Sequence, residues 1–412
     1  MGKANFESSD ISDINTEIAG KANLESSDTS DINTEANLQT TTSRFDKFKP
    51  FKAKKKDKNP DHVSLSLIDK LLPLFIVLAI ILGILLSVYV PSSRDAFSGS
   101  EIIGVSIPLA IGLIIMMIPP LVKVEWEKLN QLNYKVLLVS LLINWIICPL
   151  LMFGLAWLVL FNYPEYRIGI IMIGLARCIA MVLIWNEIAL GDNNLCAIIV
   201  VINSILQVIL YAPLLIFYCY VITGDPAEDV SYELVAKSVA FFLGVPLGAG
   251  IVLRTVLKYT KTYDTLIKFI SPWSLIGLLY TIIVIFIEKG NEFIHEIGDA
   301  FLCFVPLALY FLITWFGTFF ILRWSAPAPA ECCDDEKRKR GCNAKYAEVV
   351  TQTFTASSNN FELSLAVAIS IYGSGSKQAI ASTFGVLLEV PILLVLSYLA
   401  RYFKNKLSWG PE

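Results

Sequence analysis

Charged residues and histidine are scarce in this sequence. Of its 412 residues, 17% are charged and two are histidine, whereas 55% are hydrophobic and the mean hydropathy is +0.62. A soluble protein of this size contains about 45–50% apolar residues. The composition therefore predicts a membrane protein. His62 and His295 lie outside or at the edge of the apolar runs, which excludes a zinc-protease helix with two histidines on one face.

Several signatures of enzymes are missing as well. The sequence has no G-x-x-x-x-G-K-[ST] loop, and the turn GSGSK over 373–377 lacks that spacing. It also has no paired membrane aspartates in a G-x-G-D setting. We therefore expect a transporter rather than an enzyme, one that does not hydrolyse ATP and needs no cofactor or resident metal. The net charge of −3 gives no indication of a nucleic-acid partner, and we expect none.

Cysteine is too sparse and too scattered for a disulfide framework, with eight residues in the whole sequence. Three of them share one charged loop that contains no histidine, namely Cys332, Cys333 and Cys342. We interpret this loop as a solvated linker, with binding of a soft metal or arsenic as the alternative. Four cysteines in apolar runs are interpreted as packing residues: Cys148, Cys196, Cys219 and Cys303.

The first 66 residues are polar. An acidic tail over 1–43 contains an 18-residue tandem repeat, in which ANFESSDISDINTE (4–17) recurs as ANLESSDTSDINTE (22–35). Such a segment cannot bury enough apolar surface to offset its ordering entropy, so we expect it to be disordered. A basic segment over 44–66 follows. We interpret it as a cytoplasmic anchor beside the membrane, which is compatible with binding to anionic lipid.

Ten apolar stretches of membrane length follow the basic segment. Lys and Arg concentrate in the segments that an inside N-terminus places in the cytoplasm, whereas the outer loops hold only Arg94, Arg167, Lys289 and Lys377. By the positive-inside rule, this asymmetry predicts a multi-pass protein with both termini in the cytoplasm. The stretches cover approximately 67–90, 101–122, 135–161, 168–190, 195–222, 235–254, 266–288, 297–322, 347–371 and 378–403.

Ten spans can form two inverted repeats of five helices, an architecture that places transport sites at the membrane midplane. We therefore predict an all-α membrane protein with a first repeat over 67–222 and a second over 223–403. A cytoplasmic loop would occupy 323–346 and a C-terminal tail 404–412.

Faint internal similarity supports the two halves. SILQVILYAPLL over 204–215 resembles VLLEVPILLVL over 386–396, and this alignment pairs Gln207 with Glu389. The fourth and ninth apolar stretches would then be partners, and both have a polar centre.

The polar centre of the fourth stretch is an arginine–cysteine pair, within GLARCIAMVLIWNEIALGD over 174–192. A charge at the bilayer centre costs at least about 2.5–3.5 kcal/mol on insertion scales, so Arg177 must face a cavity or a counter-ion. An adjacent arginine also favours the thiolate form of Cys178. This thiol is therefore a candidate ligand for a thiophilic species. A small packing residue is the alternative.

Two glutamates lie in the last two stretches, Glu362 in SSNNFE and Glu389 in LLEVP. An intramembrane carboxyl group, balanced between desolvation and nearby positive charge, can take up and release protons near neutral pH. Alternatively, each glutamate pairs with Arg177 or caps broken backbone. Nearby amides could hydrogen-bond a neutral polyhydroxy solute or join helices to one another; they are Asn203, Gln207, Asn359 and Asn360.

Several longer stretches, taken in order, resemble a known family. They are GLARCIAMVLIWNEIALGDNNLC, NSILQVILYAPL, IHEIGDAFLCFVPLALYF, SSNNFELSLAVAISIYG and KQAIASTFGVLLEVPILL. All are similar to fungal arsenite efflux permeases, which belong to the bile acid/arsenite/riboflavin transporter superfamily. The resemblance covers Leu67 to Phe403 and leaves out the repeated N-terminus.

The resemblance implies a function and a set of residues. The family exports arsenite, and in some members antimonite, across the plasma membrane in exchange for protons, and so confers arsenic resistance. Its fold is two inverted five-helix repeats with crossed, discontinuous helices 4 and 9. Its functional cysteine falls on Cys178, preceded by Arg177, and its functional glutamate on Glu362. Further family positions fall on Trp185, Asn203, Arg254, Phe354, Asn360 and Glu389.

We therefore expect protons to be carried by Glu362, with Glu389 tuning or sharing them, and Arg254 and Phe354 to have further functional roles. The residues expected to bind arsenite are Cys178, Arg177, Trp185, Asn203 and Asn360. Two alternatives remain open. The first is a sodium-coupled organic-anion carrier of the same fold, in which Arg177 binds the anion and SSNN with Glu362 binds sodium. The second is a membrane sensor whose tail and cysteine-rich loop recruit partners, which predicts signalling without flux.

Overall fold

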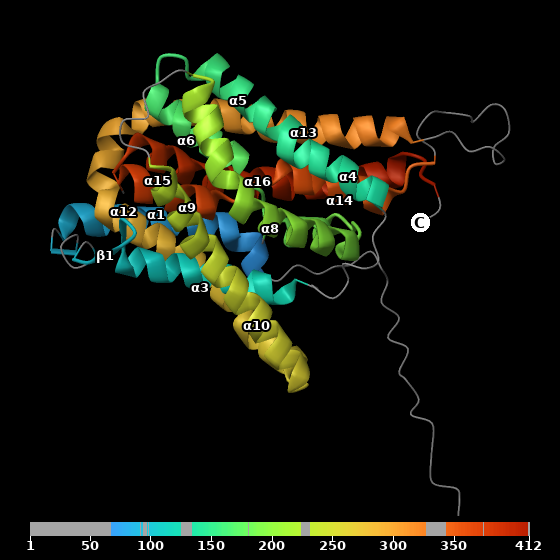
Figure 1. Cartoon of the computed structure of the whole chain (residues 1–412), viewed down its shortest axis with the longest axis horizontal. Coiled ribbons are helices and arrows are strands. Elements are labelled where there is room, and N and C mark those ends of the chain that lie inside the picture. The colour runs from blue at the N-terminus through green and yellow to red at the C-terminus, as the bar shows by residue number, and fades with distance from the viewer. Residues whose placement is uncertain are drawn as a thin grey trace, which may run out of the picture. The chain divides into compact units, whose positions relative to one another are not determined.

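The computed structural model describes most of the chain beyond the N-terminal segments. The described residues are 67–90, 92–93, 97, 99–124, 134–179, 181–223, 231–326, 343–373 and 375–410. The predicted tail over 1–43, the basic segment over 44–66 and the three loop cysteines fall outside these ranges. The described part of the chain is almost entirely helical and includes one two-stranded hairpin (Figure 1).

The elements up to residue 221 include one hairpin and two π-helical turns, η2 and η3. In chain order they are α1 (Leu67–Tyr89), β1 (Glu101–Ile102), β2 (Val105–Ser106), α3 (Ile107–Lys123), α4 (Tyr134–Leu142), η2 (Ile143–Ile147), α5 (Cys148–Val159), α6 (Pro164–Leu175), α7 (Met181–Ile188), α8 (Asn193–Ile216) and η3 (Phe217–Val221).

The elements after residue 230 include a further π-helical turn, η4, and a 3-10 turn, η5. In chain order they are α9 (Tyr232–Val239), η4 (Ala240–Gly244), α10 (Val245–Tyr259), α11 (Tyr263–Ile270), α12 (Pro272–Ala300), η5 (Phe301–Cys303), α13 (Phe304–Ser325), α14 (Tyr346–Ser357), α15 (Phe361–Tyr372) and α16 (Lys377–Lys406).

Length and hydropathy confirm the prediction of an all-α membrane protein. Six continuous helical stretches of the described chain are long and apolar enough to cross a bilayer. They also present large apolar side chains outward, as Ile209 and Val252 do at 61% and 62% exposure, which suits lipid rather than water. The six are Tyr134–Val159, Asn193–Val221, Tyr232–Tyr259, Thr265–Glu288, Phe301–Ser325 and Lys377–Lys406.

The predicted helical start at residue 101 is wrong, because residues 101–106 form a hairpin. Glu101 pairs with Ser106 and Ile102 with Val105 in antiparallel register. The two turn residues, Ile103 and Gly104, have φ of 53° and 73°. Positive φ at both central residues is the backbone of a type I′ turn, which matches the twist of the flanking strands. The helix α3 therefore begins only at Ile107.

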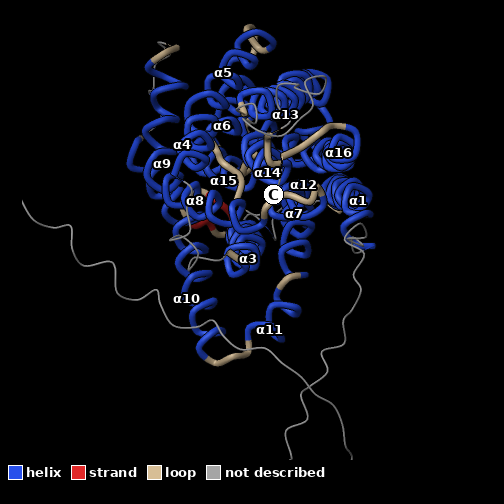
Figure 2. Tube along the Cα trace, turned by 90° about the vertical axis from the view of Figure 1, so that its right-hand side faces the viewer, coloured by secondary structure: helices blue, strands red, loops and turns tan. Residues whose placement is uncertain are grey.

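Packing divides the helices into two bundles. In what we call the small bundle, α1 packs along α12, and α3 packs between α12 and α10. In what we call the large bundle, α13 packs against α5, α14 and α16, while α16 also lies along α6 and α15 (Figure 1). The helix α9 packs on α8 and α15 and continues through η4 into α10, so it links the two bundles. The helices α10 and α11 extend together away from the rest of the small bundle (Figure 2).

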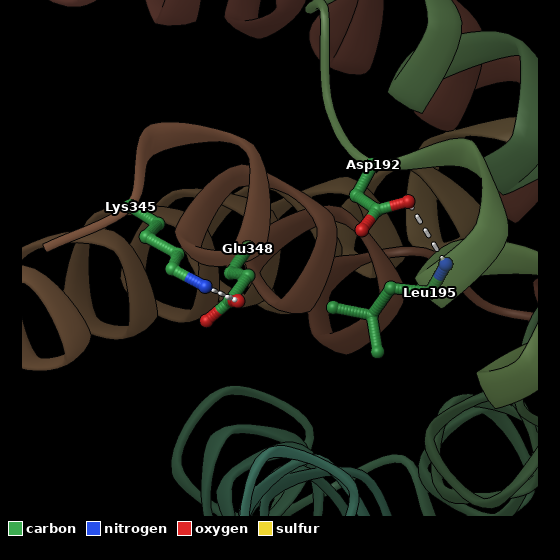
Figure 3. Close-up of polar contacts among 4 residues, drawn as sticks. All are labelled: Asp192, Leu195, Lys345 and Glu348. Atoms are coloured by element: carbon green, nitrogen blue, oxygen red, sulfur yellow. Dashed lines mark hydrogen bonds and ion pairs between the residues drawn. The ribbon is translucent and has the colours of Figure 1, made fainter. Parts of the chain in front are cut away.

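Hydrogen bonds of Asp192 connect the start of α8 to α14. Asp192 caps α8, and its Oδ1 accepts hydrogen bonds from the backbone N–H groups of Asn194 (2.8 Å) and Leu195 (3.1 Å). Its own N–H donates to Thr351 Oγ1 on α14 at 2.9 Å. Beside it, Lys345 donates to Glu348 at 2.9 Å (Figure 3), which raises the pKa of Lys345. Both side chains of this pair are partly exposed, so it adds little stability.

Candidate functional site

Two helix breaks cross at the centre of the large bundle. The first separates α6, which ends at Leu175, from α7, and the second separates α14 from α15, which begins at Phe361. Across them, Arg177 and Asn359 form a single antiparallel bridge pair, and Asn360 N–H donates to Ala176 O at 3.0 Å. Each break thus satisfies backbone groups of the other, which a membrane interior requires.

The C-terminal ends of two half-helices meet on one side of the crossing, and the Arg177 side chain lies there. Its guanidinium donates to Gly174 O in the last turn of α6 and to Tyr310 Oη at 3.2 Å. Tyr310 in turn donates to Ala356 O, in the last turn of α14, at 3.1 Å. Each helix C-terminus carries about half a negative charge. The two ends together therefore provide roughly the counter-charge that a buried arginine needs.

The N-terminal ends of the other two half-helices lie around Cys178. The Cys178 thiol is within hydrogen-bonding range of the Val182 backbone N–H, in the first turn of α7, and of the Ser358 hydroxyl. Its charged neighbours are the carboxyl groups of Glu389 and Glu362. A helix N-terminus carries about half a positive charge and favours an anion. The helix ends therefore favour an anion here, whereas the two carboxyl groups oppose a negative charge on the thiol.

The two glutamates occupy different environments beside the second break. Glu389 is 3% exposed, and its carboxylate accepts a hydrogen bond from the Ser358 hydroxyl. Glu362 lies in the first turn of α15 and is only partly buried. Each is an electrostatic neighbour of the other. Two carboxyl groups so placed exchange protons as a coupled pair.

The structure corrects the expected effect of Arg177 on Cys178. Consecutive residues of extended backbone point to opposite sides, and the guanidinium lies against Cys148 and Tyr310 rather than Cys178. Cys148, interpreted from the sequence as a packing residue, therefore has a charged neighbour. Cys148 also donates to Ala356 O at 3.4 Å. Nor do the glutamates pair with Arg177, because no ion pair joins them in the described part of the chain.

Three amides surround the crossing with unused hydrogen-bonding capacity. Gln207 Oε1 accepts the backbone N–H of Arg177, Asn359 Oδ1 accepts from Tyr310 at 3.4 Å, and Asn360 Oδ1 accepts the N–H of Leu363 at 3.0 Å. Within the described residues, the NH₂ groups of all three have no partner. An unpartnered buried donor is costly unless a ligand or water completes it. These amides therefore can bind a polar solute.

A cavity opens beside the second break, between the two bundles. Glu362 and Asn360 reach it from α15 and its cap, and Ile179 reaches it from the first break. Cys178, at 4% exposure, precedes Ile179 in the chain but is not itself a lining residue. The remaining lining residues are Met116, Met117, Met181, Ser274, Leu275 and Leu278. A small solute in the cavity would be next to the Glu362 carboxyl group and the Asn360 amide.

The other residues expected at the site are buried but more distant. Trp185 belongs to α7, and Phe354 packs edge-on against Trp315 with ring centroids 6.1 Å apart. Asn203 accepts from Trp145 Nε1 at 3.0 Å and so joins α8 to η2. Arg254 does not reach the crossing. It donates to Val122 O (3.0 Å) and Lys123 O (3.1 Å), and so caps the C-terminus of α3.

Two residues of the crossing were missed by sequence analysis as individual site residues. Tyr310 connects Arg177 to both breaks, yet in the sequence it is one aromatic residue in an apolar run and carries no signal. Ser358 lies between Cys178 and Glu389. Its position in SSNN, inside an otherwise apolar stretch, is the signal that could have identified it.

Comparison with known proteins decides the family. The profile of the sodium bile acid symporter family matches residues 110–296. The arsenical-resistance protein Acr3 of Corynebacterium glutamicum is 38% identical over 354 residues, which cover 83% of this chain and 91% of that protein. The chain belongs to the Acr3 family of arsenical-resistance proteins. The resemblance found in the sequence is confirmed at the level of this family.

Further relatives agree with membership of the Acr3 family. The Acr3 arsenical-resistance protein of Alkaliphilus metalliredigens is 26% identical over 360 residues, covering 84% of this chain and 94% of that protein. An uncharacterised transporter of Synechocystis is 30% identical over 379 residues, covering 85% of this chain and 91% of that protein. As a member of the Acr3 family, the chain is a membrane transport protein and not an enzyme.

Proposed function

We propose that this chain exports arsenite, and also antimonite, from the cytoplasm in exchange for protons. The observation that carries the proposal is the convergence of Cys178, Glu362 and Glu389 at the N-terminal ends of two half-helices. A thiophilic ligand and a pair of proton carriers are the two components that such an exchange requires. The names of the relatives, which are arsenical-resistance proteins, support arsenite as the substrate.

Cys178 acts as a single, reversible ligand. Arsenous acid is neutral and carries three hydroxyl groups. The thiol sulfur forms a bond to arsenic, one hydroxide leaves, and the thiol proton combines with it to give water. Release is the reverse reaction, in which water attacks arsenic and restores the thiol. The N-terminal end of α7 favours the thiolate during the exchange, and one sulfur ligand binds weakly enough to let the substrate go.

Glu362 carries the exchanged proton, because it is the carboxyl group that lines the cavity. Glu389 is buried and hydrogen-bonded to Ser358, so it tunes Glu362 and shares its proton. Arg177 contributes by holding the crossing together rather than by touching the substrate. Trp185, Asn203, Arg254 and Phe354 support the elements that carry these groups.

Two inverted five-helix repeats, 67–222 and 223–403, account for the position of the site. The hydrogen bonds around the crossing support this symmetry, because Gln207 binds the first break as Glu389 binds the second. Rocking of the small bundle against the large one then exposes the crossing alternately to each side. The protein would act in the plasma membrane with both termini in the cytoplasm, as the distribution of Lys and Arg favours.

Accumulation of arsenite in inside-out vesicles tests the proposal. With an imposed pH gradient, acid inside, we expect uptake that collapses when the gradient is dissipated. Cys178→Ala should reduce uptake to the level of vesicles without the protein, whereas Cys303→Ala, which changes a buried thiol in η5, should retain it. Full activity of the Cys178 variant, or uptake that ignores the gradient, would reject the mechanism.

Sodium coupling to an organic anion is the competing function, and the name of the matching family keeps it open. It requires Arg177 to bind the anion. The guanidinium is instead directed to Gly174 O and Tyr310, on the opposite side of the crossing from Cys178. Uptake driven by a sodium gradient in the same vesicles, without any dependence on pH, would favour this alternative.

A further inference from the structure

The cavity beside Cys178 has an unusual sulfur content. Of the six methionines in the sequence, three line it: Met116 and Met117 from α3, and Met181, the first residue of α7. Two others, Met152 and Met172, are fully buried and are not among the lining residues. We infer that this cavity is an access subsite, where thioether sulfurs and the Asn360 amide hold a trivalent metalloid hydroxide before it reaches Cys178. The inference rests on the proposed function and specifies where its substrate first binds.

The polar groups of the cavity match a molecule that both donates and accepts hydrogen bonds. Among the described residues, Asn360 Nδ2 has no partner, although its residue is only 2% exposed. It can donate to a hydroxyl oxygen. The Glu362 carboxyl group lines the same cavity and can accept from a hydroxyl. The only other polar side chain in the lining is Ser274, which already donates to Met116 O at 3.0 Å.

Thioether sulfur is suited to binding a metalloid weakly and for a short time. It is soft and polarisable, so it has an affinity for soft centres that a leucine lacks. It has no proton to lose, so it makes only a weak donor contact with arsenic and releases it quickly. A carbon polyol of similar size, such as glycerol, offers the same hydroxyl groups without a soft centre. The methionines therefore favour the metalloid over the polyol.

The position of the cavity fits a path from the cytoplasm. Ser274 and Leu275 lie in the first turn of α12, and Met116 and Met117 lie in the second half of α3. These regions adjoin the segments around Lys123 and Lys268, which the charge distribution predicts to be cytoplasmic. Ile179, next to Cys178, forms part of the wall. A solute entering from that side meets the methionines before the thiol.

Replacement of the sulfurs alone tests the inference. The variant Met116→Leu/Met117→Leu/Met181→Leu keeps apolar character and approximate volume. In the vesicle assay we expect its KM for arsenite to rise about threefold or more, with little change in maximal rate, since a ground-state contact is lost. The control Met152→Leu/Met172→Leu removes two buried sulfurs elsewhere and should leave the KM unchanged. Equal KM values in the two variants would overturn the inference.

A binding measurement keeps the inference separate from the proposed function. Cys178→Ala protein in vesicles is oxidised with hydrogen peroxide, with and without arsenite, and the methionine sulfoxide at Met181, the most exposed of the three, is quantified by mass spectrometry. It is expressed relative to the oxidation of free methionine in the same sample, because arsenite itself consumes peroxide. Protection by arsenite, but not by glycerol, supports the subsite even if proton-coupled export fails. Equal oxidation with arsenite and with glycerol rejects the subsite even if Cys178 proves essential for export.

Discussion

Arg177 and Cys178 are neighbours in the chain, but they lie in opposite electrostatic environments. The extended backbone between them directs the guanidinium to the C-terminal ends of α6 and α14 and the thiol to the first turn of α7. The partial charges of helix ends therefore accommodate both a buried cation and a potential anion within one dipeptide. At this scale, Gly174 O and Tyr310 at the crossing supply partners for a charge inside the membrane.

Removal of the Tyr310 hydroxyl tests this explanation. In Tyr310→Phe, Arg177 Nη1 and Ala356 O both lose a hydrogen bond. We expect stability to fall by about 1–3 kcal/mol, because a buried polar group is left unsatisfied. Thermal unfolding in detergent measures the change, and Tyr218→Phe, in the π-helical turn η3, serves as a control. An unchanged unfolding temperature in Tyr310→Phe would show that the bridge does not hold the crossing.

The two glutamates should respond differently to neutral replacement. Glu362→Gln removes the carboxyl group that lines the cavity, so uptake should no longer depend on the pH gradient. Glu389→Gln leaves an amide oxygen that still accepts from Ser358, so uptake should slow but stay coupled to the gradient. Arsenite uptake at several imposed gradients distinguishes the two. Gradient-driven uptake by Glu362→Gln would assign the proton to another group.

At the scale of elements, the ends of the half-helices position the polar groups that face the cavity. Asn360 caps α15 through its Oδ1 and presents its Nδ2 group without a partner at the cavity. One amide thus both starts a helix and offers a donor to a solute. The backbone N–H of Asn360 donates to Ala176 O, which joins this break to the break between α6 and α7. A change at this residue therefore affects structure through one atom and binding through another.

Two substitutions at Asn360 separate these effects. Asn360→Asp keeps a capping oxygen, so its unfolding temperature should match that of the original protein, while transport should fall because the donor is lost. Asn360→Ala removes the cap as well and should cost about 1 kcal/mol of stability in addition. Unfolding curves and arsenite uptake are measured on the same preparations. Full transport by Asn360→Asp would show that the NH₂ group has no part in binding.

The elements could largely be predicted from sequence, whereas the contacts at the crossing could not. Hydropathy and length located all six long apolar stretches, because membrane solvation acts on each helix separately. The polar centres likewise indicated both breaks. The hairpin over 101–106 was missed because its apolar residues Ile102, Ile103 and Val105 run directly into the apolar sequence of α3. The direction of Arg177 and the role of Tyr310 depend on tertiary packing between distant segments, which no local pattern encodes.

At the scale of the whole described structure, the hairpin β1–β2 closes the end opposite the cavity. Ser370 Oγ of α15 donates to Ile103 O at 2.6 Å and also bonds to Ser238 Oγ of α9 at 2.6 Å. Ser106 donates to Glu288 of α12 at 2.5 Å. The hairpin, which precedes α3 of the small bundle, thus attaches to α15 of the large bundle. The two bundles are therefore joined at the end where the hairpin lies.

Gly104→Ala should weaken this closure. A Cβ at Gly104 would lie 2.8 Å from Ser370 O, and the φ of 73° is unfavourable for alanine. We expect slower arsenite uptake and faster labelling of Ser238→Cys by a maleimide that cannot cross the membrane. Gly373→Ala is the control, because its φ of 88° is also positive while no atom lies within 4 Å of the added Cβ. Equal labelling in the two variants would contradict the role of the contact.

Backbone strain at Ile103 limits how strongly the hairpin contact is stabilised. A β-branched residue at a φ of 53° stores about 1–3 kcal/mol of backbone strain, which opposes the hydrogen bond at its carbonyl. If opening of the contact relaxes Ile103, the strain released offsets part of the lost hydrogen bond, and the closed and open populations would differ by a modest ratio. A differential binding energy of only a few kcal/mol inverts such a ratio. Under the proposed exchange, a difference of this size would come from the proton and the small solute at the crossing.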